Sequence, residues 1–250
     1  MIQGLENFRV FFEGFEDRYT LIGGVACHLS MTEAGFNFRA TKDLDIVLCA
    51  EALDSEFVKK FWEFIKEGEY EHQEKSSEGK QFYRFIKPKS DDFPFMLELF
   101  SRKPDDLLLE ISNNLTPIPT DEEVSSLSAI LLDDAYYECI QDGKEIVNNL
   151  PILKPEYIIP FKMKAWLDLT TRKNNGEQID SRNIKKHKND VLKLSQLLSP
   201  GLTVKVSDNI KKDVSDFINE IKKEDVDTKA LGIKGLTCDN ICDLLSSIYL

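Results

Sequence analysis

A change in hydrophobic pattern near Pro155 constrains the fold of this 250-residue chain more than any other feature. Before it, helical patterns alternate with short β-rich runs. After it, the apolar residues recur almost entirely at helical spacing. The first part predicts a mixed β-sheet flanked by helices, and the second predicts a helical bundle. We therefore expect an α+β fold with two domains, residues 1–153 and residues 154–250.

The individual elements follow from the same pattern. In the first part, helices are predicted at residues 5–15, 25–33, 52–66 and 136–141, and strands at residues 19–22, 44–49, 81–86, 95–100, 107–111 and 127–132. In the second part, helices are predicted at residues 156–170, 181–198, 209–222 and 239–249, with a polar connector at residues 171–178.

Two glycines end the first predicted strand. Gly23 and Gly24 follow an apolar run and precede a helical pattern. Without Cβ atoms, their backbone can approach a phosphate closely, and the N-terminus of the following helix favours an anion. A glycine pair at a strand end is more often only a tight turn, so both interpretations stay open for this motif taken alone.

Two carboxylates, two positions apart, come at the start of the next predicted strand. Asp43 and Asp45 lie on one face of that strand, about 6.6 Å apart along the chain. Mg²⁺ takes oxygen ligands of this kind, usually one or two carboxylates together with substrate phosphates. By itself such a pair is usually a solvated loop edge. The glycine pair and the carboxylate pair in this order predict a site for Mg²⁺ and a phosphate.

The two motifs together resemble the signature of the nucleotidyltransferase superfamily. The spacing of Arg39, Thr41, Asp43 and Asp45 is most similar to that of the abortive-infection (AbiE-type) toxin nucleotidyltransferases of type IV toxin–antitoxin systems. The resemblance implies a nucleotidyltransferase-fold sheet flanked by helices. It also implies transfer of a nucleoside monophosphate from an NTP to an acceptor hydroxyl, on a tRNA 3′ end or a protein, and a cognate antitoxin as partner.

The resemblance continues in the second half of the chain. Residues 155–166 are similar to a Pro-Glu helix of those relatives, and residues 186–191 are similar to their Lys-Asp-x-x-Asp-Leu helix. On this basis Lys162 matches the family lysine that contacts nucleotide phosphate, and Asp190 matches its acidic partner. His187 stands where the family has its first aspartate, which is a departure from the pattern.

The superfamily usually carries a third carboxylate on a neighbouring strand. Glu98 is the best candidate, because a lone charge inside an apolar strand needs a reason to be there; the alternative is an edge residue that faces outward. The resemblance then implies two Mg²⁺ ions held by Asp43, Asp45 and Glu98, with Glu98 also a general base. It implies contacts to the NTP from Gly23, Gly24, Arg39, Thr41, Lys162 and Asp190.

The charge of the chain limits its partners. A net charge of −12 disfavours non-specific binding of DNA or RNA and binding to an anionic membrane surface. Residues 162–193 are locally basic, however, with nine Lys/Arg and four Asp/Glu. This basic segment suggests a local anion site, and it leaves room for a structured tRNA end.

Other sequence features bear on location and on competing functions. The five cysteines are scattered, and neither a secretory signal nor an apolar run of about 18 residues is visible, so we expect a cytoplasmic protein. Two alternatives to the toxin-like enzyme remain. One is a non-catalytic partner-binding protein that keeps the fold, and the other is a small-molecule nucleotidyltransferase of the antibiotic-modifying type.

Overall fold

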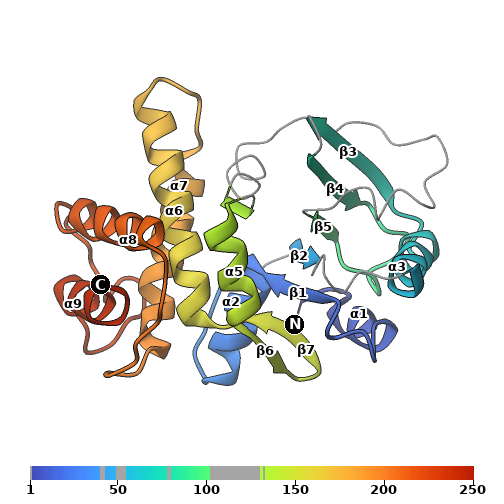
Figure 1. Ribbon diagram of the computed structural model, residues 1–250, viewed down its shortest axis with the longest axis horizontal. Helices are drawn as coiled ribbons and strands as arrows, with labels where there is room; N and C mark the ends of the chain where they lie inside the picture. The colour runs from blue at the N-terminus through green and yellow to red at the C-terminus, as the bar shows by residue number, and fades with distance from the viewer. Residues whose placement is uncertain (1, 40–42, 49–54, 78–79, 102–129, 132) are drawn as a thin grey trace. The chain divides into compact units, whose positions relative to one another are not determined.

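The computed structural model describes residues 2–39, 43–48, 55–77, 80–101, 130–131 and 133–250 (Figure 1). The chain divides into two compact units. Unit 1 comprises residues 1–120 and 144–153, and unit 2 comprises residues 121–143 and 154–250. The strands that the structure describes lie in unit 1, and the helices after residue 154 lie in unit 2, so the chain has the α+β class predicted from the sequence.

Unit 1 is built on a mixed sheet. Its described strands are β1 (Tyr19–Ile22), β2 (Asp43–Leu48), β3 (Glu71–Ser77), β4 (Lys80–Ile86), β5 (Met96–Ser101), β6 (Lys144–Val147) and β7 (Leu150–Leu153), in the order β3-β4-β5-β2-β1-β7-β6. Strand β2 runs antiparallel to β1 and parallel to β5, and β4 runs antiparallel to both β5 and β3. Strand β7 pairs with β1 in parallel and with β6 as a hairpin.

Aromatic side chains fill the core on one face of this sheet. Helices α1 (Leu5–Phe11) and α3 (Ser55–Glu67) supply several of them, and α3 places Phe57, Phe61 and Phe64 at helical spacing. The ring of Phe61 lies 5.7 Å from that of Phe85 on β4, and the ring of Phe57 stacks on Tyr19 of β1 at 6.3 Å. These contacts show that Phe85 and Tyr19 lie on the face of the sheet that α1 and α3 cover.

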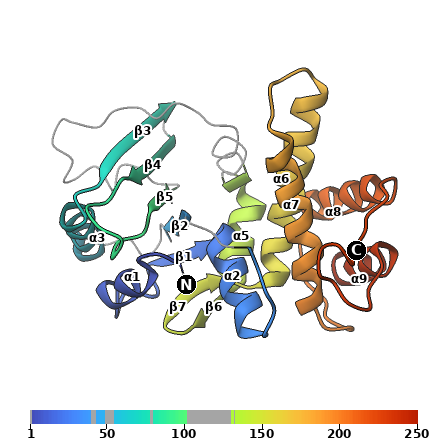
Figure 2. The same ribbon diagram turned by 180° about the vertical axis from the view of Figure 1, so that it is seen from behind.

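Unit 2 is helical. Its elements are α5 (Asp134–Asp142), α6 (Pro155–Asn174), α7 (Ser181–Leu194), the short 3₁₀ helix η4 (Ser195–Leu197), α8 (Asp208–Ile221) and α9 (Cys238–Tyr249). Helices α6 and α7 lie side by side in both views (Figures 1 and 2), and α6 also packs on α8 through Trp166 and Phe217, whose rings are 5.2 Å apart. Helix α5 precedes residue 153 in the sequence but packs on α6 and α8.

Most elements predicted from the sequence are confirmed, with shifts of a few residues at their ends. Helix α2 (Gly23–Glu33) begins at the glycines, and the helix predicted at residues 156–170 extends to Asn174. Strands β3, β6 and β7 were not predicted. The strand predicted at residues 107–111 lies outside the described residues, and the one at residues 127–132 is wrong for Ile130 and Leu131, which are helical.

Candidate functional site

The glycine pair forms the junction between β1 and α2. Ile22 ends the strand in an extended conformation, and Gly23 then takes a φ of +68° as the helix begins. A side chain with a Cβ disfavours this left-handed conformation, so the turn requires glycine. Gly24 is buried in the first turn of α2. The sequence prediction of a strand–glycine–helix turn is therefore confirmed.

Strand register places two of the three acidic residues, Asp45 and Glu98, in one row across the sheet. Asp45 lies opposite Ile22 of β1 on one side and opposite Glu98 of β5 on the other. Asp43 lies two positions earlier on β2, opposite Met96. The end of β1 that leads into the glycine pair, the middle of β2 and the middle of β5 are thus aligned.

The other residues predicted near this motif are placed only in part. Thr41 lies outside the described residues. Arg39 is half-buried, and its guanidinium carbon lies 5.6 Å from the centroid of the Phe38 ring. The structure therefore shows an aromatic contact for Arg39, and its contact with a nucleotide remains a prediction.

Glu98 is a buried carboxylate in an apolar strand. It is 8% exposed, and its neighbours Leu97 and Leu99 are fully buried. Leu97 lies opposite Phe85, on the face covered by α3, so Glu98 occupies the other face. An ionised carboxylate in such a place costs on the order of several kcal/mol unless it is paired.

Arg84 supplies that pairing. It is the residue of β4 directly opposite Glu98, and its Nε donates a hydrogen bond of 2.8 Å to Oε1 of Glu98. The Nη2 atom of Arg84 donates to the same oxygen. Arg84 was not predicted as a site residue, although its position inside the apolar run of residues 82–86 gives the same signal as that of Glu98: a charge where the pattern calls for an apolar residue.

The carboxylate set fits a hard divalent cation by its donor chemistry. Asp43, Asp45 and Glu98 offer the oxygen ligands that Mg²⁺ prefers, and register brings the last two to opposite positions of adjacent strands. Of these three side chains the structure describes that of Glu98. Among all the side chains it describes, no group of three or more His, Cys, Asp or Glu residues could hold a metal ion. The fit to Mg²⁺ therefore rests on donor chemistry and strand register.

The second predicted set of residues lies in unit 2. Lys162 of α6 and Asp190 of α7 form an ion pair, with 3.2 Å between Nζ and Oδ2. Both residues are buried, at 6% and 1% exposed. The structure thus brings together the two residues that the resemblance paired, and their contact joins α6 to α7.

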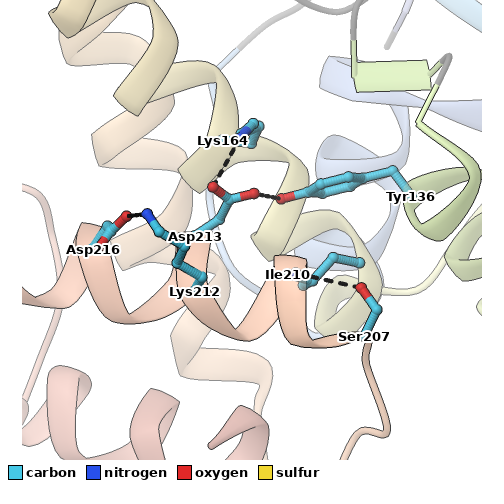
Figure 3. Close-up of polar contacts among 7 residues, drawn as sticks. All are labelled: Tyr136, Lys164, Ser207, Ile210, Lys212, Asp213 and Asp216. Carbon is cyan, nitrogen blue, oxygen red and sulfur yellow. Dashed lines mark hydrogen bonds and ion pairs between the residues drawn. The ribbon is translucent and has the colours of Figure 1, made fainter.

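A further polar cluster connects three helices of unit 2 (Figure 3). The Tyr136 hydroxyl of α5 donates to Oδ2 of Asp213 on α8 at 2.9 Å, and Nζ of Lys164 on α6 donates to Oδ1 at 2.8 Å. Burial raises the pKa of Tyr136 well above its ordinary value, and the negative charge of Asp213 raises it further. The hydroxyl therefore stays protonated and acts as a donor.

The net positive charge of the basic segment, residues 162–193, is smaller in the folded unit than a count along the sequence suggests. Its described ion pairs join Lys162 to Asp190, Lys164 to Asp213, Arg172 to Asp168 and Glu177, Arg182 to Asp180, and Lys188 to Glu224. Two of these acids, Asp213 and Glu224, lie beyond residue 193 and therefore outside the segment. Much of the positive charge counted along the segment is therefore matched within unit 2.

Comparisons with known proteins give fold likenesses. No protein-family model matches the chain, and a search of the curated proteins finds no match. Among solved structures, the chain is similar to an antigenic nucleotidyltransferase-like protein from Paracoccidioides brasiliensis, with 16% identity and a TM-score of 0.44 over 92% of this chain and 94% of that one. It is also similar to the Megavirus polyadenylate synthase, with 10% identity and a TM-score of 0.42 over 88% of this chain. The match spans only 37% of that synthase.

Within the part of the chain that the structure describes, no helix combines the length and the apolar character needed to cross a lipid bilayer.

Proposed function

We propose that the chain is a Mg²⁺-dependent nucleotidyltransferase that moves a nucleoside monophosphate from an NTP to an acceptor hydroxyl. The observation that carries this proposal is the row across β1, β2 and β5. It aligns the strand end before Gly23 with Asp45 and Glu98. A phosphate-approaching turn beside carboxylates is the combination that handling of a metal-bound triphosphate requires.

In the proposed reaction, the acceptor oxygen attacks the α-phosphorus of the NTP. A new bond forms between that oxygen and phosphorus, the bond from the α-phosphorus to the bridging oxygen breaks, and pyrophosphate leaves. The acceptor proton passes to a base, for which Glu98 is the candidate because it is a buried carboxylate in the row. Bound Mg²⁺, one or two ions, would neutralise the charge of the triphosphate and of the leaving pyrophosphate.

The remaining residues receive roles by the same chemistry. Gly23 and Gly24 offer backbone N–H groups at the start of α2, where an anion is favoured. Arg39, Thr41 and Lys162 are proposed to contact phosphate, and Asp190 to orient Lys162, with which it is paired. These roles derive from the resemblance of their motifs to those of nucleotidyltransferases.

The finer identity also belongs to the proposal. The Arg-x-Thr-x-Asp-x-Asp motif and the helix that begins at Pro155 support an AbiE-type toxin, with a tRNA 3′ end or a protein hydroxyl as acceptor and a cognate antitoxin as partner. The neighbouring gene offers a simple check. A small DNA-binding antitoxin-like protein supports the toxin role, whereas a metabolic operon supports a small-molecule acceptor.

Label transfer tests the proposed activity. Purified chain is incubated with each α-labelled NTP, MgCl₂ and a cell extract that supplies acceptors, and labelled products are resolved. Wild type should transfer label, and Asp43→Asn and Asp45→Asn should each lose at least about 10²-fold, the loss expected when charge stabilisation in the transition state is removed. Asp91→Asn, in an exposed turn of the same unit, is the matched control and should keep wild-type activity. Equal labelling by all four proteins contradicts the proposal.

One observation favours a second function, that of a non-catalytic partner-binding protein. Two candidate site residues are held by ion pairs within the chain, Glu98 by Arg84 and Lys162 by Asp190. Titration calorimetry with NTP and Mg²⁺ separates the two functions. Binding at sub-millimolar nucleotide supports the enzyme, and absence of binding at millimolar nucleotide supports the partner-binding protein.

A further inference from the structure

We infer that Arg84 is a positioning residue of the same site, which acts by fixing the carboxylate of Glu98. This inference rests on the proposed function, because it assigns Arg84 a part in that reaction. It goes beyond the sequence motifs, since Arg84 belongs to none of them.

The position of Arg84 in the sheet supports this role. Arg84, Glu98 and Asp45 occupy directly opposite positions on the adjacent strands β4, β5 and β2. In the register of the sheet, Glu98 thus lies between Asp45 and Arg84. A cation at the far end of the row holds the middle carboxylate from the side opposite to Asp45.

The contact itself is suited to orientation. Both Nε and Nη2 of Arg84 donate to Oε1 of Glu98, and both side chains are largely buried, at 15% and 11% exposed. A planar guanidinium has its donors in a fixed fork, so two contacts to Oε1 hold that oxygen of Glu98 at one place relative to the guanidinium. A lysine keeps the charge but offers a point-like ammonium without that fork.

The strands around the pair limit its movement. Leu97 and Leu99 are fully buried on either side of Glu98, and Phe85, next to Arg84, contacts the ring of Phe61 on α3. The backbone positions of both charged residues are therefore set by a packed sheet and not by a loop. A carboxylate held in this way keeps one geometry before any ligand arrives, which is the condition for a preorganised site.

The competing role for Arg84 is direct contact with the triphosphate. The two roles predict different kinetics. A residue that acts through Glu98 changes kcat and loses its effect when Glu98 is removed, whereas a phosphate contact changes KM for the NTP and acts independently of Glu98.

A double-mutant cycle tests the inference with Arg84→Gln, Glu98→Gln and the double variant, together with Arg84→Lys. Lys87→Gln is the matched control, because Lys87 follows β4 and makes an exposed ion pair with Glu71. The measurements are kcat and KM for label transfer, binding of Mn²⁺ followed by the signal of the free ion, and thermal unfolding. The double variant and Arg84→Lys leave no carboxylate buried without a partner, which keeps the test valid if Arg84→Gln folds poorly.

We expect Arg84→Gln to lower kcat by about 10- to 100-fold with KM for the NTP within about twofold, and to weaken Mn²⁺ binding several-fold. Arg84→Lys should recover part of both, and the double variant should be no worse than Glu98→Gln. The inference is overturned if the losses of Arg84→Gln and Glu98→Gln are additive in the double variant, or if Arg84→Gln changes only KM. It is also overturned if Arg84→Gln behaves like the control Lys87→Gln.

The two proposals fail in different ways. If wild type binds Mn²⁺ but transfers no label, the proposed function fails and the Mn²⁺ cycle still decides the role of Arg84. If wild type transfers label and the cycle is additive, only the inference fails. A wild-type chain that binds no Mn²⁺ overturns the inference, because Arg84 then has no metal-ligating carboxylate to position.

Discussion

Two buried ion pairs, one in each unit, are assembled in different ways. Arg84 and Glu98 are opposite residues of neighbouring strands, so strand register alone brings them together. Lys162 and Asp190 lie on separate helices and meet because α6 packs against α7. The pair in the sheet belongs to a row that continues to Asp45, whereas the pair in unit 2 connects two helices.

This difference separates two uses of buried charge. A sheet can align charged residues across several strands, and each further strand adds a position to the same row. A helix pair brings its charges together at one crossing, as Lys162 of α6 and Asp190 of α7 do. We therefore expect changes at the row to affect activity first, and changes at the helix pair to affect stability first.

Exchanging the charges of the row gives the largest expected effect. The double variant Arg84→Glu/Glu98→Arg keeps an ion pair between β4 and β5 but places a cation opposite Asp45. Transfer should fall by at least about 10²–10³-fold, because position 98, opposite Asp45, no longer carries a carboxylate. The free energy of unfolding should stay within about 2 kcal/mol of wild type, because the pair survives.

Label transfer and urea unfolding check this variant, with the exposed pair exchanged as Lys87→Glu/Glu71→Lys for control. Wild-type transfer by the row variant shows that the sheet pair serves stability and not activity, and so contradicts the expected difference between the two pairs.

Removing one partner of the helix pair gives the next largest effect. Lys162→Met leaves the carboxylate of Asp190, which is 1% exposed, without its lysine, and should cost about 3–5 kcal/mol in the free energy of unfolding. The double variant Lys162→Met/Asp190→Leu should recover most of that loss, because both charges are gone. Urea unfolding measures both. If the single and the double variant are equally unstable, the pair is not what joins α6 to α7.

Two aspartates on α8 allow a comparison within unit 2, between an acid in the polar cluster and an acid in an exposed ion pair. Asp213 accepts from Tyr136 and Lys164, whereas Asp216, one turn away, makes an exposed pair with Lys212 at 2.5 Å (Figure 3). Asp213→Ala should cost about 2–3 kcal/mol in the free energy of unfolding, since it removes two hydrogen bonds of a charged group. Asp216→Ala should cost at most about 0.5 kcal/mol. Equal costs in urea unfolding would show that the polar cluster around Asp213 does not stabilise the packing of α5, α6 and α8.

The pH dependence at Tyr136 gives the smallest effect. Burial raises the pKa of Tyr136 above its ordinary value of 10, so its hydroxyl stays neutral when that of the unfolded chain ionises. Its contribution to stability is therefore fully present below about pH 10 and is lost as the pH rises further. Tyr136→Phe should cost about 1 kcal/mol at pH 7, and its stability should decline less steeply above pH 10.

Urea unfolding between pH 7 and pH 11 tests this dependence. Tyr157→Phe serves for comparison and should flatten the curve less, because Tyr157 is only half-buried and burial raises its pKa less than that of Tyr136. Parallel curves for wild type and Tyr136→Phe above pH 10 are the result that contradicts it.

The parts of the fold that could be predicted from the sequence are those whose pattern is local. The apolar spacing of α3 and the run that forms β1 required no knowledge of neighbours. Strand β3 is polar throughout and lies at the edge of the sheet, where a strand needs no apolar pattern to pair, so it carries no local signal. The β6–β7 hairpin does carry a local signal in its sequence, which was not recognised. Asn148 and Asn149 both take positive φ, as the residues of a tight two-residue turn do.

The candidate site divides in the same way. Gly23, Asp45 and Glu98 could be proposed as site residues because each stands out within its own stretch of sequence, and register then aligned Ile22, Asp45 and Glu98. The partner of Arg84 could not be assigned, because it is set by the pairing of β4 with β5. Likewise the neutralisation of the basic segment depends on Asp213 and Glu224, which lie outside it in sequence and next to it in the folded unit.

Nucleotidyl transfer at the row of carboxylates is the activity on which the contrast between the two units depends. Its most direct test measures pyrophosphate released per labelled product, over a range of Mg²⁺ concentrations, for wild type, Asp45→Asn and Asp91→Asn. Wild type and Asp91→Asn should release one pyrophosphate per label transferred, in a manner that depends on Mg²⁺, and Asp45→Asn should lose nearly all of both. Release of pyrophosphate by Asp45→Asn at the wild-type rate, or transfer without any pyrophosphate, would contradict nucleotidyl transfer at this row.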